Sequence, residues 1–252
     1  MAIHFLKHYQ KLVFFHFRRF KGNNYQLMRE YFAGILIEDI ERHLPLWGKK
    51  ILDVGGSKGE FCRTLNKLRN CQAINLDPYP EQFGRLLAGD IWPDTKKAFA
   101  DQIPFDDDEF NLVICRSVLE HIPPDKQQNS LNQMYRVTKP EGICYIAIPP
   151  WYNPFAGHAV KPFHYLPFKL AKFLARNINR KKITAKNLAE LNLYPITFKK
   201  ILSMIRQSGF EIIETKDAHL RLHFITRIPI LREILVPSVV FILFKKRKGA
   251  DQ

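Results

Sequence analysis

The feature that most constrains this chain is a short apolar run that ends in a glycine-rich turn, residues 51–61, with the sequence ILDVGGSKGEF. Phe61, Leu65 and Leu68 then recur at helical spacing, so the stretch predicts a strand, a tight loop and a helix. That order is typical of an open α/β fold. Glycine permits a positive φ and a close approach of a ligand to the main chain, and a helix start offers unpaired N–H groups. The loop therefore favours a nucleotide-like ligand.

The spacing of the glycines excludes two common nucleotide motifs. They stand at Gly55, Gly56 and Gly59, with Asp53 two residues before the first, which is not the dinucleotide pattern G-x-G-x-x-G. No lysine followed by Ser or Thr is present in the loop, so it is not a P-loop. The order Asp-x-Gly-Gly-Ser-x-Gly after a strand resembles the first motif of class I S-adenosylmethionine-dependent methyltransferases. A glycine turn that only connects a strand to a helix remains the alternative for this loop taken alone.

Three further segments extend the resemblance. Residues 73–77 predict a second strand that ends in Asp77, about 20 residues after the loop, where a doubly wound fold places a carboxylate on ribose hydroxyls. Pro78 then stops the strand. Residues 101–105 (DQIPF), the acidic turn 106–109, the apolar strand 110–115 and residues 117–122 (SVLEHI) follow. This order resembles the small-molecule and lipid methyltransferase branch of the same superfamily.

The resemblance covers residues 45–150 well and the rest by general layout. Ser57 stands where many members have a second motif glycine, and Asn111 stands where Asp is usual after Phe. Ser57 is small enough for the loop, and Asn111 begins a strand, so neither departure puts cofactor binding in doubt. The chain as a whole has 252 residues, of which 46% are hydrophobic, enough for one domain with a sizeable core.

The resemblance implies a Rossmann-like, seven-stranded, mostly parallel sheet with helices on both faces and an antiparallel last strand. We expect one domain overall, divided into N-terminal helices (1–44), a cofactor-binding core (45–150), a substrate-side lid with basic helices (151–209) and C-terminal strands of the same sheet (210–252). The periodicity predicts helices over 25–44, 60–68, 81–87, 127–137 and 197–208, and a third strand at the end of 89–100. It predicts a turn at 139–142 before a fifth strand over 142–149, a sixth over 210–214 and a seventh, at the sheet edge, over 238–244.

The resemblance also assigns the site residues and implies S-adenosyl-L-methionine as cofactor. Asp77, with Pro78 after it, is expected at the ribose, and Asp101 with Gln102 at the adenine. Cys115 and Arg116 are expected to line the methionine end of the cofactor. The loop residues are expected around its amino-acid part: Asp53, Gly55, Gly56, Ser57 and Gly59.

Residues 151–167 are dense in aromatic, Pro and His residues, which favours a shaped pocket or lid over a plain connector. If the acceptor is a hydroxyl, an imidazole suits removal of its proton near neutral pH. The candidates are His121, His158 and His164, each of which has a structural alternative, such as packing a helix or hydrogen-bonding a loop carbonyl. The four cysteines lie far apart and include no C-x-x-C pair, so no metal site is predicted. We expect them to be buried thiols in a reducing compartment.

Charge is unevenly distributed. The net charge is +5 over residues 1–50, −3 over 51–150 and +13 over 151–252. Basic flanks around an acidic cofactor half favour an anionic partner: a phospholipid surface, a phosphorylated small molecule or a nucleic acid. A basic surface that only aids solubility is the other interpretation. Oligomeric state is left open by the sequence.

Residues 1–21 alternate basic with aromatic and aliphatic side chains and contain no acid. They lack the apolar core of a signal peptide and are too polar to span a bilayer. Two interpretations stay open: an interfacial helix on anionic lipid, or packing of the aromatics over the cofactor domain. Residues 228–244 are interrupted by Arg232, Glu233 and Pro237, so we expect an inserted connection and an edge strand there and not a membrane span.

These features predict a cytoplasmic methyltransferase, peripheral to a membrane, that O-methylates a lipid-linked, glycan or other anionic small molecule. The alternative is an RNA-directed enzyme or a nucleic-acid-binding relative. An amino-directed nucleic-acid methyltransferase would show Asn/Asp-Pro-Pro-aromatic after the fourth strand, where this chain has Cys-Arg-Ser-Val. The Pro-Cys of a cytosine-C5 enzyme is also absent there. A catalytically silent scaffold is disfavoured because the acidic cofactor residues are intact.

Overall fold

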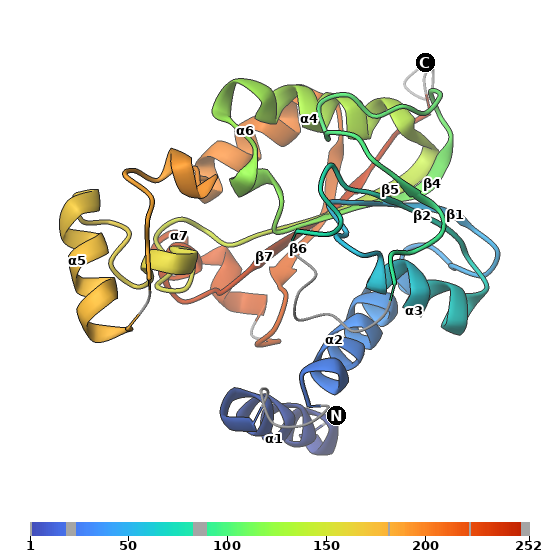
Figure 1. Ribbon diagram of the computed structural model, residues 1–252. Coiled ribbons are helices and arrows are strands. Elements are labelled where there is room, and N and C mark those ends of the chain that lie inside the picture. The colour runs from blue at the N-terminus through green and yellow to red at the C-terminus, as the bar shows by residue number, and fades with distance from the viewer. Residues whose placement is uncertain (1, 19–23, 83–89, 181, 222, 248–252) are drawn as a thin grey trace.

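A computed structural model describes residues 2–18, 24–82, 90–180, 182–221 and 223–247. It contains a seven-stranded sheet in the order β3-β2-β1-β4-β5-β7-β6 (Figure 1). The strands are β1 (Lys50–Val54), β2 (Gln72–Leu76), β3 (Thr95–Lys96), β4 (Phe110–Arg116), β5 (Thr138–Ile148), β6 (Glu211–Asp217) and β7 (Val239–Phe244). Neighbours from β3 to β5 run parallel, and β7 runs antiparallel to both β5 and β6. The predicted fold class is confirmed.

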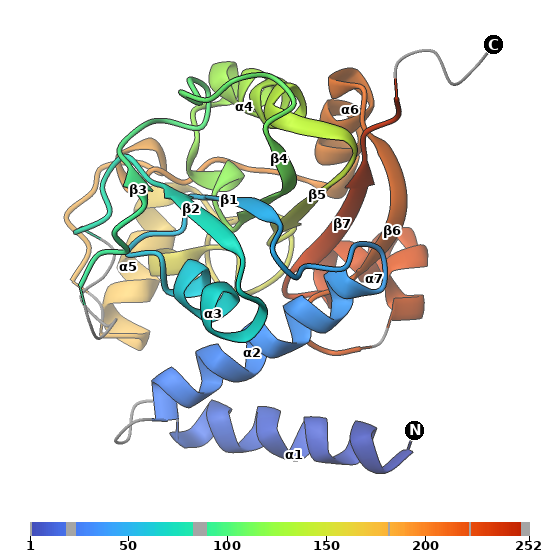
Figure 2. The same cartoon turned by 90° about the vertical axis from the view of Figure 1, so that its right-hand side faces the viewer.

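Helices cover both faces of this sheet. The longer helices are α1 (Ala2–Arg18), α2 (Asn24–Glu41), α3 (Glu60–Arg69), α4 (Pro124–Val137), α5 (Phe168–Ile178), α6 (Phe198–Ser208) and α7 (Pro229–Ile234). Figures 1 and 2 show α4 and α6 above the sheet and α2 and α3 below it. Alternate residues of β4 serve the two sides: Val113 and Cys115 pack in the core with α4 and α6, whereas Leu112 and Ile114 pack in the core with α2 and α3.

Three expected elements differ from the structure. The third strand is only Thr95–Lys96 and does not run into Asp101. The fifth strand begins at Thr138, directly after α4, so the expected turn over 139–142 lies inside it, beside a register shift opposite Phe110 and Leu112. The seventh strand is not at the edge: β7 lies between β5 and β6, and β6 forms the edge. The helix expected over 81–87 falls largely outside the described residues.

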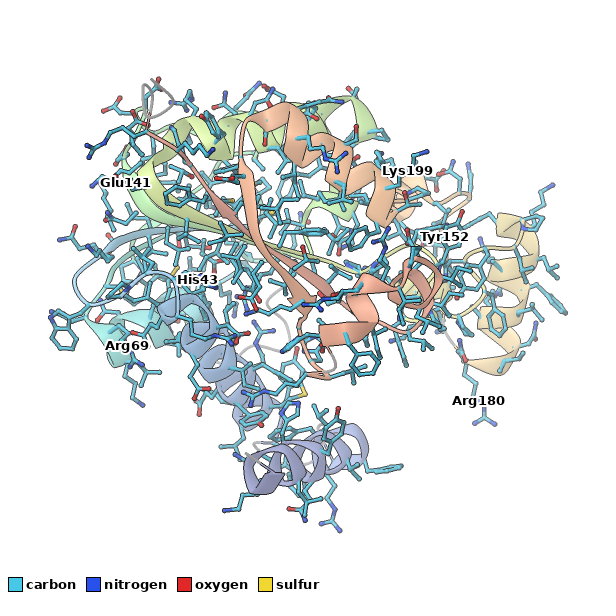
Figure 3. All side chains as sticks on the ribbon, turned by 180° about the vertical axis from the view of Figure 1, so that it is seen from behind. His43, Arg69, Glu141, Tyr152, Arg180 and Lys199 are labelled. Carbon is cyan, nitrogen blue, oxygen red and sulfur yellow. The ribbon has the colours of Figure 1, made fainter. Side chains whose placement is uncertain are left out.

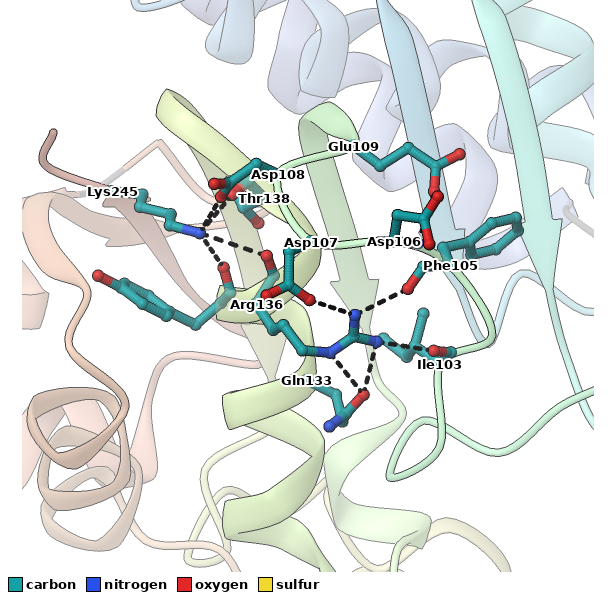
Figure 4. Close-up of polar contacts among 11 residues, drawn as sticks. Ile103, Phe105, Asp106, Asp107, Asp108, Glu109, Gln133, Arg136, Thr138 and Lys245 are labelled. Atoms are coloured by element: carbon teal, nitrogen blue, oxygen red, sulfur yellow. Dashed lines mark hydrogen bonds and ion pairs between the residues drawn. The ribbon is translucent and has the colours of Figure 1, made fainter. Parts of the chain in front are cut away.

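The acidic turn 106–109 fixes the junction between α4 and β5 (Figure 4). Arg136 donates hydrogen bonds to the carbonyl oxygens of Ile103 and Phe105, at 2.8 and 2.7 Å, and pairs with Asp107 at 2.8 Å. Lys245 from the end of β7 pairs with Asp108 and donates to the Thr138 carbonyl at 2.7 Å. These contacts give the turn a structural role, remote from the loop after β1.

The N-terminal helix α1 packs through one face only. His8 donates from Nε2 to the His219 carbonyl at 2.6 Å and accepts from the Tyr31 hydroxyl at 2.7 Å, and Phe15 is buried beside Tyr31. These contacts pack α1 on α2 and on the segment after β6, not on the cofactor-binding core of residues 45–150, while Leu6 and Phe17 remain exposed. Where the chain is described, no helix combines the length and apolarity needed to cross a bilayer.

A small separate core holds the segment after β5 together. It contains Val160 and residues of α5 and of the following loop, among them Ala171, Ala175 and Ile183. The next helix, α6, begins as predicted at Thr197, whose side chain accepts from the Lys200 N–H, and ends at Gly209 with φ +90°. The described residues of 151–197 therefore pack together beside the carboxyl ends of β4 and β5.

Candidate active site

The topology places a crevice at the carboxyl end of β1. After β1 the chain crosses to α3 on one face of the sheet, and after β4 it crosses to α4 on the other face. β1 and β4 are neighbours, so this is the switch point at which open α/β sheets bind ligands. The loop after β1, the end of β2 and the segment after β4 meet there.

The glycine loop has a backbone that few other residues could adopt. Gly55 has φ +72° and Gly59 +76°, and Ser57, in the position where the family often has glycine, also has a positive φ of +54°. A Cβ on Gly56 would lie 2.5 Å from Asp53 Oδ2 and 2.3 Å from Asn75 Oδ1. Glycine at 56 is therefore required by the two polar side chains that approach the loop.

Asp77 holds the loop in place from the end of β2. Its Oδ2 accepts a hydrogen bond from the Ser57 N–H at 2.8 Å, and its Oδ1 accepts one from the Tyr79 N–H at 2.8 Å. Pro78, between Asp77 and Tyr79 in the chain, prevents the strand from continuing. Each carboxylate oxygen has a second lone pair, so Asp77 can order the loop and still accept hydrogen bonds from a diol at the crevice.

Four buried polar atoms of the crevice lack a hydrogen-bond partner within the described part of the chain: Asp53 Oδ2, Ser57 Oγ, Asn75 Oδ1 and Arg116 Nε. Burial raises the pKa of Asp53, and the nearby Arg116, whose Nη2 lies 4.0 Å from Asp53 Oδ2, opposes that rise. The Arg116 guanidinium lies over the Phe61 ring at 4.3 Å. Buried polar groups are normally satisfied, so a carboxylate next to a guanidinium here suits a ligand that carries both an ammonium and a carboxylate.

The remaining expected cofactor residues occupy different settings. Asp101 is nearly buried, with Lys126 Nζ 3.2 Å from its carboxylate, and Gln102 beside it is exposed. Cys115 points into the core, where burial raises the pKa of its thiol well above the ordinary value. All four cysteines are free and buried, as predicted.

The structure brings two of the three candidate histidines together. His121 and His158 have ring centroids 4.8 Å apart, and His121 donates from Nδ1 to the Asn192 carbonyl at 2.6 Å. His164 lies apart: it is buried, donates from Nε2 to the Trp151 carbonyl at 2.7 Å, and faces Gly157 with Nδ1. Burial lowers the pKa of both His121 and His164. Of the three candidates, His158 is the most exposed, since His121 is half-buried and His164 buried.

Sequence reasoning missed two groups next to this site. Glu120 has 2% of its surface exposed, and burial raises its pKa to about 8; the available signal was its place in the Leu-Glu-His motif. Arg29 of α2 pairs with Glu60 at the start of α3. No local pattern indicates the Arg29–Glu60 pair, because its residues come from separate helices.

The comparisons with known proteins agree with this geometry. A family model described as a methyltransferase domain matches residues 28–215, well over half of the chain. An uncharacterized methyltransferase of Mycobacterium avium (strain 104) is 29% identical over 200 residues, covering 78% of this chain and 77% of the relative.

Two solved structures share the fold. A chain of the complex between the Haloferax volcanii Trm112 methyltransferase activator and a methyltransferase has a TM-score of 0.55 at 15% identity, covering 90% of this chain and 94% of that one. Geranyl diphosphate C-methyltransferase from Streptomyces coelicolor A3(2), solved with Mg²⁺, geranyl diphosphate and S-adenosyl-L-homocysteine, has a TM-score of 0.54 at 12% identity, covering 84% and 79%. At these identities the likeness concerns the fold alone.

The crevice fits S-adenosylmethionine in its donor set. Asp53 and Arg116 match the ammonium and carboxylate of its amino-acid part, and Asp77 matches a ribose diol. The glycine loop leaves the main chain open to close approach at the same point. Together with the family match over residues 28–215, this places the chain among the class I S-adenosylmethionine-dependent methyltransferases.

Proposed function

We propose that this methyltransferase modifies an oxygen of a lipid-linked, glycan or other anionic small molecule at an anionic membrane surface. The observation that carries the proposal is the make-up of α5 and α1, in which exposed apolar side chains alternate with basic ones. Both helices lie outside the cofactor crevice, and α5 belongs to the segment after β5.

Helix α5 buries only its small residues. Ala171 and Ala175 pack in the small core, whereas Phe173 is 61% and Ile178 62% exposed, with Arg176 exposed between them. Large apolar side chains on the outer side of a basic helix are typical of a helix that lies in a membrane interface. Lysine and arginine stems can extend along the apolar surface while their charges reach phosphate groups.

Helix α1 has the same character on its unpacked side. Phe17 is 76% exposed, Leu6 and Val13 are also exposed, and the exposed Lys7 follows Leu6 in the chain, whereas Lys11 lies over the Tyr31 ring on the packed side. Figure 1 shows α1 below the sheet and α5 beside the sheet, at the left end of the molecule. Two weak interfacial sites held in one body bind a membrane more tightly than either site alone.

The segment between β5 and α5 supports an acceptor with apolar or sugar faces. Tyr152, Phe155 and Tyr165 are exposed in it, and in Figure 3 Tyr152 and Arg180 lie on the same side of the molecule as α5. Aromatic rings offer faces for a sugar or a lipid chain, and the basic residues that follow suit a phosphate. Geranyl diphosphate C-methyltransferase, which shares the fold at 12% identity, was solved with an isoprenoid diphosphate.

The chemistry needs positioning more than acid–base catalysis. The cofactor supplies an electrophilic methyl group on sulfur, and its leaving thioether is neutral, so an in-line acceptor at near-attack distance is the main requirement. A hydroxyl acceptor must also lose its proton. We expect the cluster of Glu120, His121 and His158 to promote that loss. Its residues follow β4 and β5, and His158 is its most exposed member.

The acceptor is tested by methyl transfer from radiolabelled cofactor to a total cell extract, partitioned into lipid, polysaccharide, RNA and protein. Label in the lipid or glycan fraction is expected, and it should disappear with the Asp77→Ala variant. Label in RNA that ribonuclease removes would overturn the proposed acceptor, and the basic flank would then be a nucleic-acid surface.

Membrane attachment is tested separately by flotation with vesicles of neutral or anionic lipid. Recovery of the full chain is expected with anionic vesicles and not with neutral ones, and Phe17→Asp with Phe173→Asp should reduce it. The matched control is Leu68→Asp, a half-exposed apolar residue of α3 on the cofactor half. Equal recovery with both lipids, or no loss in the double variant, would contradict attachment through α1 and α5.

A further inference from the structure

A cluster of three metal-ligand side chains lies beside the cofactor crevice. Glu120 and His121 belong to the short helix η2 (Leu119–His121) after β4, and His158 begins η3 (His158–Val160) after β5. One ligand atom of each residue lies within 4.8 Å of the ligand atoms of the other two. Because β4 and β5 are parallel neighbours, the two short helices meet at the carboxyl end of these strands. Glu120 is four residues beyond Arg116 in the chain.

Glu120 is the member that points to a ligand. It is 98% buried by residue surface, and neither carboxylate oxygen has a hydrogen-bond partner in the part of the chain that the structure describes. Its Oε1 instead lies 3.9 Å from His158 Nε2. A buried carboxylate that no donor satisfies is unfavourable unless a cation or a proton neutralises it. The side chain is therefore poised toward the two imidazoles and toward a positive charge between them.

His121 is held as metal-binding histidines usually are. Its Nδ1–H donates to the Asn192 carbonyl at 2.6 Å, which leaves the lone pair of Nε2 for a ligand in the neutral ring. A carbonyl that accepts from the other ring nitrogen in this way fixes the tautomer and the orientation of a ligating imidazole. The His158 ring packs edge-on against it at 4.8 Å.

We propose that Glu120, His121 and His158 bind one divalent transition-metal ion, such as Zn²⁺, Fe²⁺ or Co²⁺. Two imidazoles and one carboxylate suit these borderline ions better than Mg²⁺ or Ca²⁺, which prefer oxygen ligands. Metal–ligand bonds of about 2.0–2.2 Å require the ligand atoms to close by roughly 1 Å. His158, whose side chain is half-exposed, is the least enclosed of the three ligands.

The role of the ion rests on the proposed O-methyl transfer, whereas its binding does not. Three protein ligands leave a coordination position open for a substrate oxygen. A substrate hydroxyl held there would lose its proton to solvent more readily, and its oxygen would form the bond to the methyl carbon as the carbon–sulfur bond breaks. The ion would thereby also place the acceptor next to the methionine end of the crevice, at Arg116.

The test uses metal binding itself as the readout. The full-length protein is stripped of metal with a chelator, dialysed and titrated with Co²⁺, and visible ligand-field absorption is followed before displacement by Zn²⁺. The variants are Glu120→Gln and His158→Ala, with His223→Ala as the matched control because it removes a half-exposed imidazole outside the cluster. Circular dichroism and S-adenosylhomocysteine binding report the fold of each variant.

We expect one saturable Co²⁺ equivalent in the wild type and in His223→Ala. Both cluster variants should weaken Co²⁺ binding by more than about 100-fold. Loss of a residue that only hydrogen-bonds to a metal ligand costs about 10–100-fold in affinity. If Glu120→Gln fails to fold, the half-exposed His158→Ala decides alone. A wild type without a saturable signal, or cluster variants that bind Co²⁺ as tightly as the wild type, would overturn the site. Neither result bears on the acceptor, which the methyl-transfer assay decides.

Discussion

Removal of the Asp77 carboxylate is the most direct perturbation of the cofactor site. In the structure this side chain accepts the Ser57 and Tyr79 N–H groups, both at 2.8 Å, and it is expected to accept the ribose hydroxyls with its remaining lone pairs. Asp77→Ala therefore removes the ligand contacts and also the anchor of the loop after β1. Asp77→Asn keeps the shape and one acceptor oxygen but loses the charge.

The size of the effect follows from the number of bonds. A hydrogen bond to a charged group contributes about 1.5–3 kcal/mol, so two ribose bonds contribute at least about 3 kcal/mol in a nearly buried position. At about 1.4 kcal/mol per factor of ten, Asp77→Ala should weaken cofactor binding by more than about 100-fold. The cofactor affinity of Asp77→Asn should lie between those of the wild type and Asp77→Ala, since one acceptor oxygen remains for the ribose or the loop.

Calorimetric titration with S-adenosylhomocysteine measures this directly. The matched control is Asp125→Ala, which removes an exposed carboxylate in the first turn of α4 and should bind like the wild type. Thermal unfolding of each variant separates loss of the site from loss of the fold. A folded Asp77→Ala protein that binds within threefold of the wild type would refute both the ribose contact and the loop-anchoring argument.

Two further predictions concern stability and the loop. Gly56→Ala should abolish cofactor binding, measured by calorimetry, because its Cβ would lie 2.5 Å from Asp53 Oδ2. Gly34→Ala, inside α2 with open space around it, should instead raise the unfolding free energy, measured by urea titration, by about 0.5–1 kcal/mol. Hydrogen bonds from Arg69 lower the pKa of Glu41, so the native state binds fewer protons than the unfolded state. The stability lost in Glu41→Gln, about 1 kcal/mol at pH 7, should therefore vanish as the pH falls through the lowered pKa; a constant difference down to that pH would contradict it.

The local signals of the sequence were enough for the cofactor half. The strand, glycine loop and helix over 51–69, the acid at the end of β2 and the Thr197 cap all depend on spacing within a few residues, so their positions agree with the structure. The place of β7 depends on strand order instead. Its residues are almost all buried and apolar, as an interior strand requires, whereas β6 carries Glu211 and Glu214 and suits an edge. The composition of the two strands indicated that β7 is interior and β6 is at the edge, whereas β7 was expected at the edge because it is the last strand in the chain.

Long-range partners account for what the sequence did not predict. Lys216 is fully buried and pairs with Asp39 at 3.1 Å, and Lys245 is nearly buried against Asp108. A count of charges assigns both lysines to the basic surface, since nothing nearby in the sequence indicates their carboxylates. The approach of His158 to His121, 37 residues apart in the chain, likewise depends on β4 and β5 being neighbours.

The division of charge along the chain has a physical use under the proposed function. The cofactor carries positive charge on its sulfonium and ammonium, and the core that binds it, residues 51–150, has a net charge of −3. The segment that would meet the acceptor begins the half with +13, which attracts an anion and repels a second cation. A cationic methyl donor and an anionic acceptor thus approach the end of β4 from regions of opposite charge. After transfer the product keeps its ammonium but has lost the sulfonium charge, so its attraction to the acidic side is weaker. This arrangement favours release after transfer, and it predicts that added salt weakens acceptor binding more than cofactor binding, because the acidic cofactor contacts are buried and the basic ones are exposed.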